Sequence, residues 1–71
     1  MKPSQTKHTI LRLSEVRART GLPRSTIYAL QSKGEFPHSI KLSNHGSAVG
    51  WLESEIDDWI QSRIADRNSA A

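Results

Sequence analysis

Two residues that interrupt helices, Gly21 and Pro23, lie close together in the N-terminal half of this 71-residue chain. Glycine is common just past a helix C-terminus, because it adopts the left-handed backbone conformation at little steric cost. Proline fits the first position of a helix, where its missing N–H is no loss. We therefore predict that one helix ends at Gly21 and that a second helix begins at Pro23.

The flanking residues predict the outer ends of these two helices. Ser14 is a suitable N-cap for the first helix, because its hydroxyl can accept a hydrogen bond from a free amide, and Glu15 suits the positive end of the helix dipole. Gly34 ends the second helix. Within that helix Ile27 and Leu30 lie three residues apart, the spacing of a buried stripe. Two helices joined in this way form a helix-turn-helix.

Short extended segments are predicted on both sides of this motif. Residues 10–13 are expected to form a short extended segment that packs its apolar side chains against the helices. Ile40 and Leu42 alternate with polar residues, as in a half-exposed strand. A polar turn over 43–46 leads to a second strand over 48–51. Because an isolated hairpin is marginal in water, this hairpin must pack on the helices, where it forms a wing.

The apolar residues of the last third recur with the period of an α-helix and are Leu52, Ile56, Trp59, Ile60 and Ile64. Ser54 followed by Asp57 fits a capping pattern for its start, and we expect Trp59 in the core. The predicted fold is mainly α with a small β-hairpin, a winged helix-turn-helix over residues 10–67. We expect a disordered tail over 1–9 and a frayed C-terminus over 68–71.

Basic and acidic residues are segregated along the chain. Residues 1–41 contain eight Lys or Arg and two acidic residues, a net charge of +6, whereas residues 42–71 contain two Arg and five acidic residues, a net charge of −3. Such asymmetry indicates one face turned toward a polyanion. The alternative is a solvated surface whose charges only keep the protein soluble.

Composition argues against several other classes of protein. The absence of cysteine excludes disulfides and thiolate metal sites, and His8, His38 and His45 do not have the spacing of metal ligands. No apolar run approaches the ~20 residues needed to cross a bilayer. No nucleophile is paired with a base. We expect a cytoplasmic protein that is not an enzyme and that uses no membrane, metal or cofactor.

The second predicted helix carries the strongest candidates for a binding site, namely Arg24, Ser25, Thr26 and Tyr28. A recognition helix presents its N-terminal residues to base edges in the major groove of DNA, and arginine can donate two hydrogen bonds to guanine. Further candidates for phosphate contacts are Arg17 and Arg19 on the first helix, Lys33 at the end of the second, and Lys41 and His45 in the wing. For each, plain exposure to solvent is the alternative.

Three stretches, LRLSEVRARTGLPRSTIYAL, GEFPHSIKLS and AVGWLESEIDDWIQSRI, together resemble the AlpA family of small phage and prophage regulators. The resemblance covers about residues 10–67 and implies a MerR-like winged helix-turn-helix related to phage excisionases. It further implies that residues 24–28 enter the major groove and that the wing contacts the DNA backbone. The chain departs from the family pattern at Ser47 and Ala29, where members commonly carry basic residues, and at Pro23, where serine is more usual.

Three functions follow from these observations. The first is a sequence-specific transcriptional regulator that binds double-stranded DNA, with several copies associating on adjacent sites because one small module buries only ~600–1,000 Å² on DNA. The second is an excisionase-like directionality factor that also contacts an integrase. The third is a protein-binding module that inhibits another regulator, which the acidic, tryptophan-bearing last helix would support.

Overall fold

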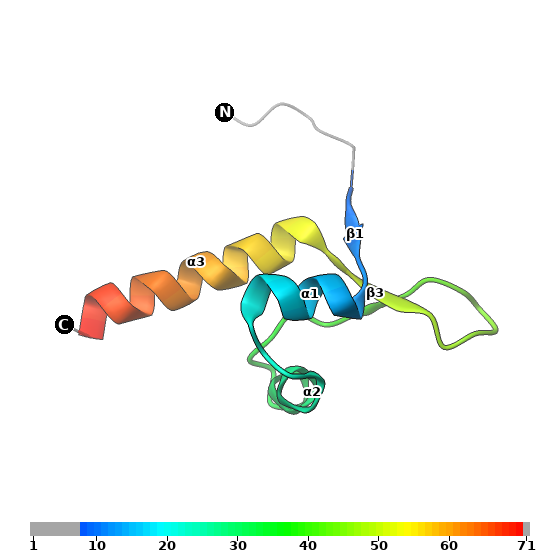
Figure 1. Cartoon of the computed structure of the whole chain (residues 1–71), viewed down its shortest axis with the longest axis horizontal. Coiled ribbons are helices and arrows are strands. Elements are labelled where there is room, and N and C mark those ends of the chain that lie inside the picture. Colours follow the sequence, from blue (N-terminus) through cyan, green and yellow to red (C-terminus); the bar gives the residue numbers. More distant parts are fainter. Residues whose placement is uncertain (1–7, 71) are drawn as a thin grey trace.

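The computed structural model describes residues 8–70, which form three helices and a small antiparallel sheet (Figure 1). In chain order the elements are β1 (Ile10–Leu11), α1 (Leu13–Thr20), α2 (Arg24–Ser32), β2 (Ile40–Lys41), β3 (Val49–Leu52) and α3 (Glu53–Ala70). This order confirms the predicted mainly α fold with a β-hairpin, and the architecture is that of a winged helix-turn-helix. In Figure 1 the loop of the wing and the C-terminal end of α3 project to opposite sides.

Glycines end both helices of the helix-turn-helix, as predicted. Gly21 has φ 73° and donates its backbone N–H to the carbonyl oxygen of Arg17 (2.8 Å). Gly34 has φ 74°, and the N–H of Glu35 after it donates to the carbonyl oxygen of Leu30 (2.8 Å). Both residues are in the left-handed region, where a side chain is strained. The turn between the helices is therefore determined by local backbone chemistry.

The first helix starts earlier than predicted. Its N-cap is Arg12, which has extended backbone, so Ser14 lies inside the first turn and does not cap it. The reason is that the carboxylate of Glu15 accepts a hydrogen bond from the backbone N–H of Arg12 (2.9 Å). A carboxylate three residues into a helix satisfies the cap amide in this way.

The predicted starts of the other two helices are also displaced, that of α2 by one residue and that of α3 by two. Pro23 is the N-cap of α2, because its carbonyl oxygen accepts the N–H groups of Thr26 and Ile27 (both 3.1 Å). In α3 the predicted cap Ser54 is already helical. The helix begins at Glu53, whose N–H donates to the carbonyl oxygen of Thr9 (2.8 Å). A partner that is distant in sequence therefore takes the place of the serine hydroxyl.

Strand β3 is central in the sheet, which has the order β1-β3-β2. On one side Leu11 is opposite Trp51, and on the other Ile40 is opposite Gly50. The wing hairpin is thus hydrogen-bonded to the N-terminal strand as well as packed on the helices. This pairing explains how so short a hairpin is stable, since a third strand supplies the support that an isolated one lacks.

Every layer of the molecule contributes to one core, whose buried residues are Leu11, Val16, Ile27, Phe36, Trp51 and Ile56. Trp59, which was expected in this core, is only half-buried at its margin. Its ring meets Phe36 edge-on, with 4.8 Å between centroids, and its indole N–H donates to the carbonyl oxygen of Glu35 (2.8 Å). The predicted apolar stripe of α3 extends beyond the core, because Ile64 is 38% exposed.

The two predicted terminal segments are only partly described. Of the predicted tail, residues 1–7 lie outside the described range, and Thr9 is bonded to α3 as noted above. At the other end α3 is helical as far as Ala70, so Asn68 and Ser69 belong to the helix. Over residues 8–70, none of the helices is both long enough and apolar enough to span a membrane.

Gly50 provides a direct test of the contact between β1 and β3. A Cβ atom at this position would overlap with Cγ2 of Ile10 and would lie 3.2 Å from the carbonyl oxygen of Leu11. Gly50→Ala should therefore lower the free energy of unfolding by about 1–3 kcal/mol, the usual cost of overpacking. Chemical denaturation measures this change.

The matched control for that experiment is Gly46→Ala in the loop of the wing. There a Cβ atom would meet only ordinary contacts, the nearest being Oγ of Ser43 at 3.4 Å. A surface change of this kind should alter stability by less than about 0.5 kcal/mol. Equal effects of the two substitutions would contradict the packing argument.

Candidate nucleic-acid interface

Helix α2 presents its predicted reading residues to solvent. Ile27 is fully buried and Leu30 is half-buried, and these two side chains fix the rotation of the helix about its axis. As a result Arg24, Ser25 and Tyr28 are exposed, with Thr26 half-buried beside them. The face of α2 opposite the core therefore carries one guanidinium group and several hydroxyl groups.

Arg24 belongs to a stack that connects α2 to the wing. Its guanidinium carbon lies 5.8 Å from the centroid of the Tyr28 ring. The Tyr28 ring in turn lies 6.3 Å from the Trp51 ring, at an interplanar angle of 53°. A cation over an aromatic face is worth ~0.5–1 kcal/mol at an exposed site. This is enough to bias the Arg24 side chain toward one orientation on the exposed face.

The Trp51 side chain also joins α2 to the wing through polar contacts. Its ring is fully buried. The indole N–H is shared between the side-chain oxygen of Gln31 (2.9 Å) and the carbonyl oxygen of Pro37 (3.2 Å). A buried N–H requires a partner, because leaving it unpaired costs ~1–3 kcal/mol. These bonds hold the second half of α2, the following loop and strand β3 in one arrangement.

The remaining predicted basic residues divide between two parts of the molecule. Lys41 on β2 and His45 in the loop of the wing are exposed, as are Arg17 on α1 and Lys33 at the C-cap of α2. Arg19 instead faces α3, where its guanidinium pairs with the carboxylates of Glu53 (2.8 Å) and Asp57 (3.6 Å). The structure therefore places Arg19 in an ion-pair network with α3, apart from α2.

Sequence reasoning missed three residues that shape this surface. Arg12 is an exposed cation whose Nε donates to the carbonyl oxygen of Val49 (3.0 Å), so it lies at the base of the wing. Gln31 and Trp51 hold the wing to α2. The position of Arg12 directly before a basic helix was a usable signal. Nothing in the spacing of Gln31 and Trp51 indicates that the two side chains meet.

Within residues 8–70, the His, Asp and Glu side chains form no group of three or more that could hold a metal ion. The acidic residues gather on the first turns of α3, where Glu53 and Asp57 are engaged by Arg19. These carboxylates complement the positive end of a helix dipole. The arrangement is therefore a structural one in which an arginine fastens α1 to α3.

Comparison with known families identifies the chain's relatives. A family model described as "Prophage CP4-57 regulatory protein (AlpA)" matches residues 9–64, which include every helix and strand but the end of α3. The chain belongs to the AlpA family. This result confirms the resemblance that the three sequence stretches indicated, and it covers the helix-turn-helix together with the wing.

Two known proteins are similar to this chain over most of its length. The uncharacterized protein ORF88 of Enterobacteria phage P4 is 48% identical over 65 residues, covering 92% of this chain and 72% of the relative. The DNA-binding transcriptional activator AlpA of Escherichia coli K12 is 38% identical over 60 residues, covering 76% of this chain and 83% of the relative. Both similarities span most of each protein.

Gln31→Met tests the link between α2 and the wing, because methionine keeps the length of the side chain and removes the oxygen that accepts the Trp51 N–H. The Pro37 carbonyl still accepts that N–H, so the expected loss is that of one hydrogen bond, about 1 kcal/mol. Thermal or chemical unfolding measures it. Gln61→Met on the exposed part of α3 is the matched control and should be neutral. A neutral Gln31→Met would show that the bond does not stabilise the fold.

Proposed function

We propose that this AlpA-family chain is a sequence-specific DNA-binding transcriptional regulator. In this proposal α2 lies in the major groove and the β2–β3 wing lies against the DNA backbone. The observation that carries it is the stack of Arg24, Tyr28 and Trp51, which holds an exposed guanidinium group on the face of α2 that points away from the core. The name of the E. coli relative, a DNA-binding transcriptional activator, supports the same function.

The start of α2 suits contact with a phosphate group. Pro23 supplies no side-chain cap, and its carbonyl oxygen accepts only the N–H groups of Thr26 and Ile27. The amides of Arg24 and Ser25 are thus available to an anion at the positive end of the helix dipole. A phosphate oxygen bound there would fix the register of the helix on the duplex, while Arg24 reads a base edge.

The distribution of charge supports one orientation on DNA. Five exposed cations without an ion-pair partner within residues 8–70 lie on or next to α1, α2 and the wing, and they are Arg12, Arg17, Arg24, Lys33 and Lys41. Two further exposed arginines, Arg63 and Arg67, lie toward the other end of α3. The acidic start of α3 is on a different element and is partly neutralised by Arg19. A polyanion is therefore attracted to the helix-turn-helix and the wing and repelled from the start of α3.

The name of the E. coli relative, a transcriptional activator, favours a transcriptional regulator over an excisionase-like factor. An excisionase would share the same DNA contacts and would in addition bend the duplex. A bending assay on the selected site therefore discriminates the two functions. The third function, binding to a protein, concerns a different surface.

In vitro selection of bound duplexes followed by quantitative binding tests the proposal. Arg24→Ala should cost about 1–3 kcal/mol on the preferred duplex and little on other sequences, because it removes a base contact. Lys41→Ala should weaken binding to all sequences and reduce the salt slope by about 1, because it removes a phosphate contact. Arg67→Ala on the exposed end of α3 is the control and should have little effect.

Equal binding of wild type and Arg24→Ala to every duplex would remove Arg24 as a reading residue. An unchanged salt slope for Lys41→Ala would remove the wing from the backbone contact. Protection of the duplex in a footprint reports the length of the site independently of both variants. The wild-type chain should therefore be footprinted first, at low ionic strength.

Substitutions of Tyr28 separate the role of its ring from that of its hydroxyl. If the ring supports Arg24, Tyr28→Phe should retain sequence preference, whereas Tyr28→Ala should relax preference as Arg24→Ala does. The measurement is the ratio of affinities for the selected duplex and a scrambled one. A Tyr28→Phe variant that loses as much preference as Tyr28→Ala would instead assign the contact to the hydroxyl.

A further inference from the structure

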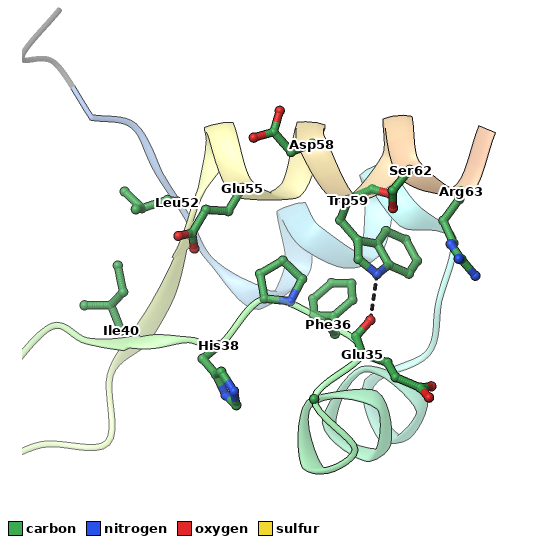
Figure 2. A pocket seen from close by; sticks show the side chains of 12 residues that line it. Glu35, Phe36, His38, Ile40, Leu52, Glu55, Asp58, Trp59, Ser62 and Arg63 are labelled. Atoms are coloured by element: carbon green, nitrogen blue, oxygen red, sulfur yellow. Dashed lines mark hydrogen bonds between the residues drawn. The ribbon is translucent and has the colours of Figure 1, made fainter. Parts of the chain in front are cut away.

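Helix α3 borders a groove that the DNA-binding proposal does not use (Figure 2). The groove lies between α3 and residues 34–40 and has a volume of about 840 Å³. Its apolar walls come from Phe36, Ile40, Leu52 and Trp59. Ile40 is 37% exposed at one end of this apolar lining. The surface thus has the apolar character of a contact site.

Charges of opposite sign flank the centre of this groove at equal intervals along α3. Glu55 precedes Trp59 by four residues and Arg63 follows it by four. In an α-helix these side chains therefore lie about 6 Å before and after Trp59, and about 40° to either side of it. Figure 2 shows the side chains of Glu55, Trp59 and Arg63 on the groove side of α3. Asp58 and Ser62 of the same helix also line the groove, and an acid, an aromatic ring and a base recur among these residues at intervals of four.

This pattern is complementary to itself under a two-fold rotation. Suppose that a second α3 lies antiparallel to the first, with the two-fold axis passing beside Trp59. The rotation then places the Arg63 of each copy opposite the Glu55 of the other, and the two tryptophans meet at the centre. An isologous interface requires this kind of self-complementarity. A face with one sign of charge, or with unequal spacing, would not have it.

We propose that the groove is an interface with a second copy of this chain, formed by antiparallel packing of the two α3 helices. Two Glu55–Arg63 ion pairs would flank the paired Trp59 rings. Arg63 pairs with Asp66 within its own helix, and its guanidinium carbon lies 5.9 Å from the centroid of the Trp59 ring. The Arg63 and Asp66 side chains are 56% and 64% exposed, so a second copy can reach this guanidinium group. Since the interface does not involve α2, it forms without DNA and does not depend on the proposed function.

The exposed half of α3 supports this occupant. The 18-residue helix is about 27 Å long, yet Ile56, Trp59 and Ile60 are its contacts with the core. Residues 61–69 are all exposed, and Ile64 among them is 38% exposed. A helical segment without tertiary packing is marginal in water. With the two-fold axis beside Trp59, residues 61–65 of one copy would lie along residues 53–57 of the other, so packing against another α3 would supply a contact for the first part of this exposed half.

Sedimentation of the full chain without DNA tests the proposal. The wild type should show a monomer–dimer equilibrium that weakens as salt is added, because the ion pairs are partly exposed. Glu55→Arg and Arg63→Glu should each weaken the dimer about tenfold, since each puts like charges together at two places. The double variant Glu55→Arg/Arg63→Glu should regain the wild-type dimer, because it restores both pairs with reversed sign.

Ser54→Arg and Gln61→Glu are the matched controls, because they introduce similar charges at exposed positions on other sides of α3. Both should dimerise as the wild type does. Circular dichroism checks that each variant keeps its helix content. If a single variant unfolds, the salt dependence of the wild type and the behaviour of the double variant still decide the outcome.

Four results would overturn the proposal. These are a wild type that remains monomeric at millimolar concentration, a dimer that the single variants leave intact, a folded double variant that stays monomeric, and a series of larger species. The last result would indicate head-to-tail contact. Monomeric wild type that instead captures a basic peptide in the groove would assign the surface to a partner protein. DNA binding, measured separately, would be unaffected by any of these results.

Discussion

The buried indole of Trp51 is the contact on which the proposed DNA-binding surface depends. Its N–H bonds to Gln31 and to the Pro37 carbonyl, and its ring supports Tyr28. One side chain in the central strand therefore determines where α2 lies relative to the wing. Because Arg24 stacks on Tyr28, the orientation of the proposed reading residue also depends on this tryptophan. The same side chain therefore packs the core and sets the geometry of the proposed site.

Features of the fold that depend on local interactions could be predicted from the sequence, whereas features that depend on residues distant in the chain could not. Gly21 and Gly34 were correctly predicted as helix ends, because the left-handed conformation is a local property of glycine. The predicted starts of α1 and α3 were displaced, because each is bonded to a group that the motif does not specify. For α3 that group is the Thr9 carbonyl, which is more than forty residues away in the chain. The pairing of β1 with β3 was missed for the same reason.

The candidate site shows the same division. Arg24 and Tyr28 were predicted as candidates on the second helix, and both are exposed there. Arg19 looked equivalent to Arg17 in the sequence, and both are exposed, yet Arg19 forms ion pairs with Glu53 and Asp57. Periodicity assigns a residue to a face of its helix. It does not say which other element that face meets. The neighbouring element determines whether a cation is already paired with a carboxylate or is available to an anionic ligand.

The wing is assembled from both ends of the sequence, since β3 is paired with β1 and the start of α3 is bonded to Thr9. During translation α2 leaves the ribosome well before Trp51 and Glu53 do. A nascent chain at that stage lacks the strand whose tryptophan holds α2 in place. We therefore expect α2 to reach its final position only late in synthesis, once Trp51 and the start of α3 are available.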